Sequence, residues 1–121
     1  MNPCAVAIAA LLALVYVPAQ AQDPPVTPKE IQDTWVNKTL IGATASGAAV
    51  TLKLQPDGAA SLVAGSTTDT GTWRLSEQGY CTTWKSIRAG QERCYSVRRA
   101  GAVMKVFNPD GSLSGEFKEI R

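Results

Sequence analysis

The stretch that decides the fold is Gly71–Arg99, which reads GTWRLSEQGYCTTWKSIRAGQERCYSVRR. It contains two of the three tryptophans, two of the three tyrosines and two of the three cysteines of the 121-residue chain. Two runs rich in aromatic and β-branched residues, 80–87 and 92–99, flank a turn at Arg88-Ala89-Gly90-Gln91. Such runs around a turn that contains glycine predict a β-hairpin.

If Cys81 faces Cys94 across this hairpin, the register of its two strands is fixed. Side chains alternate between the faces of a strand, so the hairpin divides into two sets of residues. We place the more apolar set inside: Tyr80, Thr82, Trp84, Arg93, Tyr95 and Val97. The other set would lie outside: Cys81, Thr83, Lys85, Cys94, Ser96 and Arg98. In this register the opposed pairs are Tyr80 with Tyr95 and Thr82 with Arg93. The candidate ligand-facing residues are Tyr80, Trp84, Arg93 and Tyr95.

Cys81 and Cys94 are the two cysteines that follow the amino-terminal segment. In an oxidising compartment an even number of cysteines predicts a disulfide. The alternatives are redox or metal chemistry, but redox pairs are usually spaced Cys-x-x-Cys and a zinc site needs four ligands. The chain contains no histidine. The sequence therefore favours a structural disulfide and predicts no metal site.

Residues 1–21 have the pattern of a secretory signal peptide. The apolar run Ala5–Val17 is too short to span a bilayer, and Ala19-Gln20-Ala21 provides the small residues that a signal peptidase recognises. We expect cleavage after Ala21, loss of Cys4 with the signal, and a periplasmic or secreted location. No second apolar run follows, so we expect no membrane span after cleavage. The alternative is an uncleaved membrane anchor.

Residues 22–26, QDPPV, predict an extended linker, and residues 27–121 predict a single domain. Thr27 can cap a short helix with Pro28 at its first position and Glu30 in the capping-box position. This helix would end near Trp35. Because Ile31 and Trp35 are four residues apart, they share one face of the helix, which could close one end of a sheet or barrel.

From residue 39 onward the chain predicts about eight short strands joined by turns. Their expected bounds are 39–43, 48–54, 59–64, 71–76, 80–87, 92–99, 102–107 and 113–119. The connections are too short for parallel crossovers, and eight antiparallel strands can close on themselves. The predicted fold class is all-β, a small antiparallel up-and-down barrel with a short N-terminal helix. An open sandwich is the alternative. The aromatic side chains would either fill the interior or line a pocket for one small ligand.

The composition excludes several kinds of function. Without histidine there is no Ser-His-Asp or Cys-His arrangement, and there is no glycine-rich phosphate loop. The acidic candidates Asp57, Asp69, Glu77 and Asp110 lie in expected turns or loops, where turn formation is their ordinary role. We therefore predict no catalytic residue, no cofactor and no enzyme activity. A net charge of +2 is too small to predict nucleic-acid binding.

Basic residues accumulate between positions 85 and 105: Lys85, Arg88, Arg93, Arg98, Arg99 and Lys105. On neighbouring strands they would form a positive face for lipid head groups, polysaccharide or an acidic protein. The alternative is an ordinary solvated face, on which basic side chains discourage strand pairing.

Several motifs together resemble a family of small secreted proteobacterial proteins of unknown function. They are Gly71-Thr72-Trp73, Gly79-Tyr80-Cys81, Trp84, Glu92-Arg93-Cys94-Tyr95, Pro109-Asp110-Gly111 and Gly115-x-Phe117. The resemblance covers roughly residues 31–120 and implies a lipocalin-like (calycin-type) barrel outside the cytoplasm. It implies no established activity and no functional residues.

We therefore expect a periplasmic or secreted non-enzymatic protein, a monomer, that binds a small apolar or anionic ligand. The second hypothesis is an inhibitor of a periplasmic protease or lysozyme, which would insert its amino terminus into the enzyme. The third is an envelope-associated structural protein that uses its basic face. Across these hypotheses, the expected partner of the chain is a small hydrophobic ligand or an envelope protein.

Overall fold

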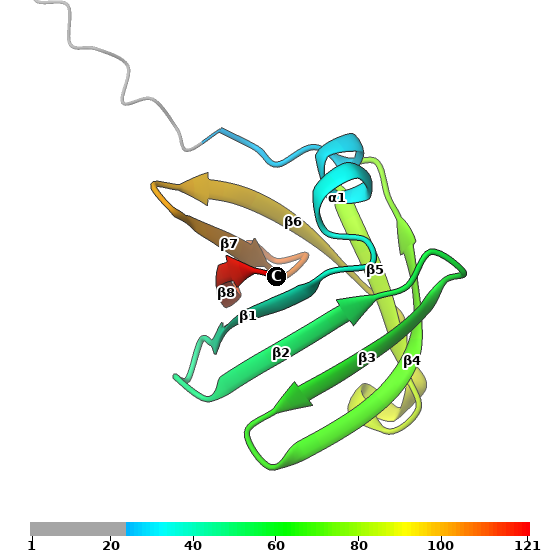
Figure 1. Cartoon of the computed structure of the whole chain (residues 1–121). Helices are drawn as coiled ribbons and strands as arrows, with labels where there is room; N and C mark the ends of the chain where they lie inside the picture. The colour runs from blue at the N-terminus through cyan, green and yellow to red at the C-terminus, as the bar shows by residue number, and fades with distance from the viewer. Residues whose placement is uncertain (1–23) are drawn as a thin grey trace, which may run out of the picture.

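The computed structural model describes residues 24–121 and shows eight antiparallel strands closed into one barrel (Figure 1). The strands are β1 (Thr39–Thr44), β2 (Ala49–Leu54), β3 (Ala59–Ala64), β4 (Thr67–Leu75), β5 (Gly79–Trp84), β6 (Arg93–Ala100), β7 (Val103–Phe107) and β8 (Leu113–Ile120). Each strand pairs with the next along the chain, and β8 returns to β1. The predicted up-and-down barrel is confirmed, and the open sandwich is excluded.

The expected signal peptide, its cleavage site and Cys4 lie outside the described residues. Within residues 24–121, no helix has the length and apolar character needed to cross a membrane.

The pairing of β5 with β6 follows the register predicted from the two cysteines. Tyr80 faces Tyr95, Cys81 faces Cys94 and Thr82 faces Arg93. The side chains that share the inner face are buried, with exposed fractions of 7% or less for Tyr80, Thr82, Trp84, Tyr95 and Val97. Arg93 lies at the end of this set and is half-buried. The disulfide joins Cys81 to Cys94 on the outer face.

Closure of the barrel depends on a close contact between β1 and β8. The register of this pair shifts between Ile41 and Gly42, as it does at a β-bulge. A Cβ atom on Gly42 would lie 1.8 Å from the backbone oxygen of Glu116. Only glycine lets the two backbones approach this closely, so Gly42 is required where the first and last strands meet.

The helix α1 (Pro28–Thr34) covers one end of the barrel, at the top of Figure 1. The backbone N–H of Glu30 donates to Thr27 Oγ1 at 3.1 Å, so Thr27 is the N-cap as predicted. Ile31 and Trp35 are both fully buried, and the Trp35 ring meets Tyr80 and Phe117 edge-on at 5.5 Å. This end of the barrel is therefore filled with side chains.

The N-terminal segment before the helix is extended and bound to β6. Pro25 forms an isolated antiparallel bridge with Arg98, and the N–H of Val26 donates to the carbonyl oxygen of Val97 at 2.8 Å. Val26 is only 1% exposed. The segment occupies the edge of β6 beyond the part that pairs with β5, so residues 24–26 belong to the packed domain.

Candidate ligand-binding site

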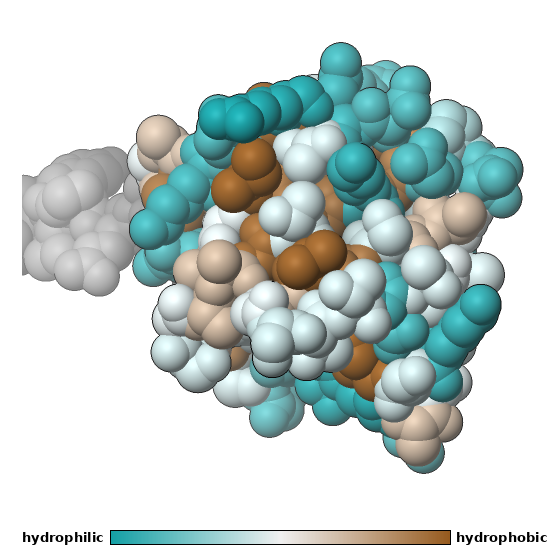
Figure 2. Space-filling model, turned by 60° about the horizontal axis from the view of Figure 1, so that its bottom comes forward, coloured by the Kyte–Doolittle hydropathy of each residue, from teal (hydrophilic) through white to brown (hydrophobic). Residues whose placement is uncertain are grey.

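The barrel is hollow at the end opposite the helix. A cavity of about 240 Å³ opens there. Its lining is mainly apolar and includes Val50, Leu52, Leu62, Tyr80, Trp84, Ile87, Tyr95, Val106 and Phe117. Figure 2 brings this end toward the viewer and shows apolar surface between paler and hydrophilic side chains. The interior is thus filled by side chains such as Trp35 at the end near the helix, and it is hollow at the opposite end. Each of the two predicted alternatives, a filled interior and a pocket, therefore describes one end of the barrel.

The segment η1 (Ile87–Gly90) lies at the open end, where it links β5 to β6 (Figure 1). Arg88 and Ala89 have left-handed backbone angles, with φ of 55° and 51°, and Gly90 has a φ of 73°. Non-glycine residues pay a conformational cost in this region, and such residues concentrate at functional sites. This backbone brings Arg88 to the cavity, with its guanidinium carbon 5.9 Å from the centre of the Tyr95 ring.

Asp69 fixes the start of this strained segment. Its carboxylate accepts hydrogen bonds from the backbone N–H groups of Ser86 and Ile87, both at 2.9 Å, and from that of Thr70 at 2.8 Å. The residue is 7% exposed. The bonds from Ile87 and Ser86 hold the pKa of the Asp69 carboxyl below its ordinary value. Asp69 was expected in a polar loop with an ordinary turn role. The loop placement is wrong, because β4 already begins at Thr67, and the turn that Asp69 stabilises is η1.

Within residues 24–121, Arg88 forms no ion pair with an acidic residue. Glu116, the other charged residue at the cavity, pairs with Lys118 at 3.7 Å. Arg88 is half-buried beside apolar and aromatic side chains. A cation in such surroundings favours an anion, since desolvated charges need a counter-charge.

The cavity wall also contains two hydroxyl groups from β5. Thr82 is 2% exposed, and its Oγ1 has no hydrogen-bond partner among the described residues. Burial raises the pKa of the Tyr80 hydroxyl, and proximity to Tyr95 raises it further, while the charge of Arg88 acts in the opposite direction. Tyr80 therefore stays protonated and neutral, so it can donate a hydrogen bond.

Three of the four candidate ligand-facing residues, Tyr80, Trp84 and Tyr95, line this cavity. The fourth, Arg93, is not part of the lining. Its Nη1 donates to Asn108 Oδ1 at 3.4 Å, which ties it to the turn between β7 and β8. The cation at the cavity is Arg88 instead.

Several of the basic residues between positions 85 and 105 make different contacts in the fold. Arg88 lines the cavity, Arg93 contacts Asn108, and Arg99 forms an ion pair with Glu30 of the helix. Lys105 pairs in register with Arg98 on the neighbouring strand. The cluster seen in the sequence is thus divided among several sites.

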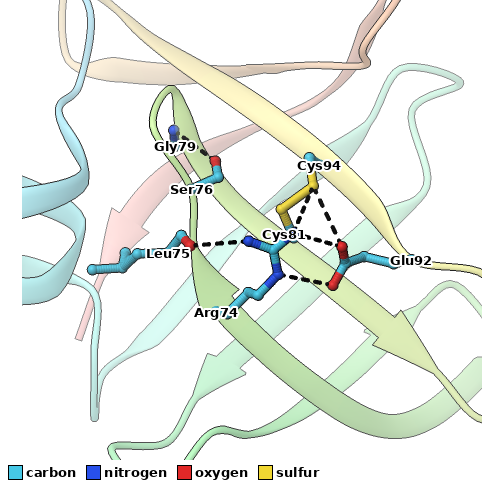
Figure 3. A network of polar contacts seen from close by, with 7 residues as sticks. All are labelled: Arg74, Leu75, Ser76, Gly79, Cys81, Glu92 and Cys94. Carbon is cyan, nitrogen blue, oxygen red and sulfur yellow. Dashed lines mark hydrogen bonds and ion pairs between the residues drawn. A yellow bond between two sulfur atoms is a disulfide. The ribbon is translucent and has the colours of Figure 1, made fainter.

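On the outer face, an ion pair lies beside the disulfide (Figure 3). Arg74 donates to both carboxylate oxygens of Glu92, at 3.0 Å and 2.7 Å, and its Nη2 lies 3.9 Å from Cys94 Sγ. The hydrogen bond from Arg74 lowers the pKa of the Glu92 carboxyl. Cys81, Cys94 and Glu92 place three potential metal-ligand atoms within 4.8 Å of one another. Both sulfurs are committed to the disulfide, however, and a thiolate is the form that binds metal.

Three residues of the site were missed as candidates from the sequence. Thr82 was placed inside but not selected, because the hairpin register alone does not show whether a hydroxyl has a partner. Arg88 was expected in a turn, but left-handed non-glycine residues have no strong sequence signal, so the sequence did not show that this turn brings Arg88 to the cavity. Asp69 could have been found only by its distance from Ser86 in the folded chain.

Comparison of the chain with protein-family models, with curated proteins and with solved structures finds no match. The class of protein that the fold defines is a closed eight-stranded antiparallel barrel with one disulfide and one open end.

Proposed function

We propose that this protein binds a small molecule with an apolar body and one anionic group in the cavity at the open end of the barrel. The observation that carries the proposal is Arg88. It is a half-buried cation at an apolar cavity, it has no acidic partner among residues 24–121, and a strained backbone segment holds it there. Strain at such a position is typical of residues kept for binding.

The size of the cavity limits the ligand. An apolar cavity of about 150 Å³ accommodates benzene. The cavity described above measures about 240 Å³, so it suits a ring with a short chain or a medium-length aliphatic chain. The apolar lining would bury this body, and Arg88 would pair with a carboxylate at the opening. Octanoate and phenylpropanoate have this chemistry.

In this proposal the protein binds its ligand without catalysing a reaction, and it does so outside the cytoplasm. The secretory pattern of residues 1–21 supports the location, and the Cys81–Cys94 disulfide is the kind of bond that persists in oxidising compartments. Membership in the small secreted lipocalin-like family suggested by the sequence motifs is part of the same proposal.

Titration with octanoate and with phenylpropanoate tests the binding proposal. Trp84 lines the cavity, so ligand binding should change the intrinsic fluorescence, and calorimetry should give the affinity. Arg88→Met keeps a side chain of similar length but removes the charge. Loss of a charge-assisted hydrogen bond should weaken binding by about 10- to 100-fold.

Lys85→Met is the matched control, because Lys85 is an exposed cation three residues away that does not line the cavity. It should leave both affinities within about twofold. The binding proposal fails if neither acid binds the wild-type protein. It also fails if Arg88→Met and Lys85→Met bind the acids equally well. Native mass spectrometry of the purified protein would then show whether another molecule occupies the barrel.

A further inference from the structure

Among the residues that the structure describes, Thr82 has a buried side-chain hydroxyl without a hydrogen-bond partner. Its hydroxyl is enclosed, since the residue is 2% exposed, and Oγ1 makes no hydrogen bond within residues 24–121. Buried hydroxyls are nearly always bonded, and an unbonded one is costly. The residue belongs to the inner face of β5 and lines the cavity. A group inside the cavity is therefore the natural partner for this hydroxyl.

The position of Thr82 along the barrel differs from that of Arg88. On β5 it lies between Trp84, which leads into η1 at the open end, and Tyr80, which packs against Trp35 at the closed end. Arg88 belongs to η1 itself. The cavity thus offers one cation near its opening and one hydroxyl further in, with apolar side chains such as Leu52 and Val106 in the same lining.

We propose that the ligand is an oxygenated small carboxylic acid: its carboxylate meets Arg88 while a hydroxyl or carbonyl oxygen on its apolar body hydrogen-bonds to Thr82. This inference rests on the proposed function and adds a second recognition point to it. The threonine hydroxyl can donate to a carbonyl or exchange bonds with a hydroxyl, so either oxygen group fits. An acid with an unsubstituted body would leave Thr82 unbonded.

This arrangement should let the site distinguish acids that carry a second oxygen group from acids that do not. Thr82 Oγ1 has no hydrogen-bond partner among residues 24–121, so a ligand oxygen would give this hydroxyl a bond that the fold does not supply. Sites that hydrogen-bond a ligand oxygen reject the analogue that lacks it, because the polar group of the protein is then left unpaired. Thr82 would thus select oxygenated acids over the corresponding plain acids.

Calorimetry with octanoate and the positional isomers of hydroxyoctanoate tests the inference. In the wild-type protein at least one isomer should bind about three- to tenfold more tightly than octanoate. Thr82→Val keeps the shape of the side chain and should remove this preference, so that the isomers bind no more tightly than octanoate. Thr82→Ser retains a hydroxyl and should keep the preference. Thr83→Val, the same change on the outward-facing neighbour, should also keep it.

The outcomes separate the two proposals. If octanoate binds but no isomer binds more tightly, or if the preference survives in Thr82→Val, the assignment of Thr82 is overturned and the proposed function stands. An ordered water on Thr82 would give the first of these results. If neither octanoate nor any isomer binds, the assignment of Thr82 is overturned, and the proposed function is overturned with it if phenylpropanoate does not bind either.

Discussion

Replacement of Thr82 by valine should stabilise the free protein. The hydroxyl is 2% exposed and has no partner among residues 24–121, whereas valine has the same shape and no polar atom. A buried polar group without a hydrogen bond costs about 1–3 kcal/mol. Since the surrounding packing is kept, we expect the free energy of unfolding to rise by about 1–2 kcal/mol. For a domain of this length, that corresponds to a rise in Tm of about 5–10 °C.

Urea unfolding followed by circular dichroism measures this effect. The midpoint should rise while the slope m is unchanged, because the surface exposed on unfolding is the same. Thr83→Val is the control: it makes the same change in β-propensity on the other face of the strand, and should alter stability by no more than about 0.5 kcal/mol. A lower Tm for Thr82→Val would refute the reasoning, because it would mean that the hydroxyl is hydrogen-bonded in the free protein.

Three further predictions concern the framework of the barrel. Asp69→Asn should weaken the acid dependence of stability: the pKa of Asp69 is below its ordinary value of 3.8, so its contribution is complete above that pH and is lost as the pH falls through the folded-state pKa. Unfolding titrations between acidic and neutral pH should show a flatter curve for the variant, and an unchanged curve would contradict the role of Asp69. Reduction of the Cys81–Cys94 bond, which closes a sequence separation of 13, should cost about 3 kcal/mol. Far-UV circular dichroism should show that the reduced protein is still folded at room temperature, with a Tm lowered by about 10 °C or more. Gly42→Ala should destabilise the barrel by about 1–3 kcal/mol in urea unfolding, because the new Cβ atom collides with the Glu116 backbone. Wild-type stability in this variant would show that β1 and β8 can separate there without cost.

Much of the architecture could be predicted from local patterns. The alternation of the apolar residues Val50, Leu52 and Leu54 with other residues predicts one buried face for β2, and all three side chains are buried. Thr27 and Pro28 marked the start of the helix. The pairing of Cys81 with Cys94 fixed one register, and the short connections left only antiparallel neighbours. These features depend on residues close in sequence or on one covalent bond, so sequence alone was sufficient.

The site was only partly predictable. Tyr80, Trp84 and Tyr95 were placed toward the interior by strand parity, and they line the cavity. Strand parity also predicted that Arg93 points inward. Arg93 is, however, at the end of the inner face of the hairpin, where its side chain donates a hydrogen bond to Asn108 in the turn between β7 and β8. Arg88 reaches the cavity through a left-handed turn that Asp69 stabilises from 17 and 18 residues away in sequence. Neither the conformation nor that contact follows from a local pattern.

The meeting of β1 with β8 also constrains how the chain reaches its native state. Leu40 pairs with Ile120, and Thr39 exchanges backbone hydrogen bonds with Arg121, so these contacts join the first strand of the barrel to the end of the last one. Contacts this distant in sequence carry the largest loop-closure entropy and slow the folding of β-barrels to milliseconds or seconds. Until β8 arrives, β1 presents an unpaired edge to other chains. A nascent copy is therefore open to misassociation until its final strand is available.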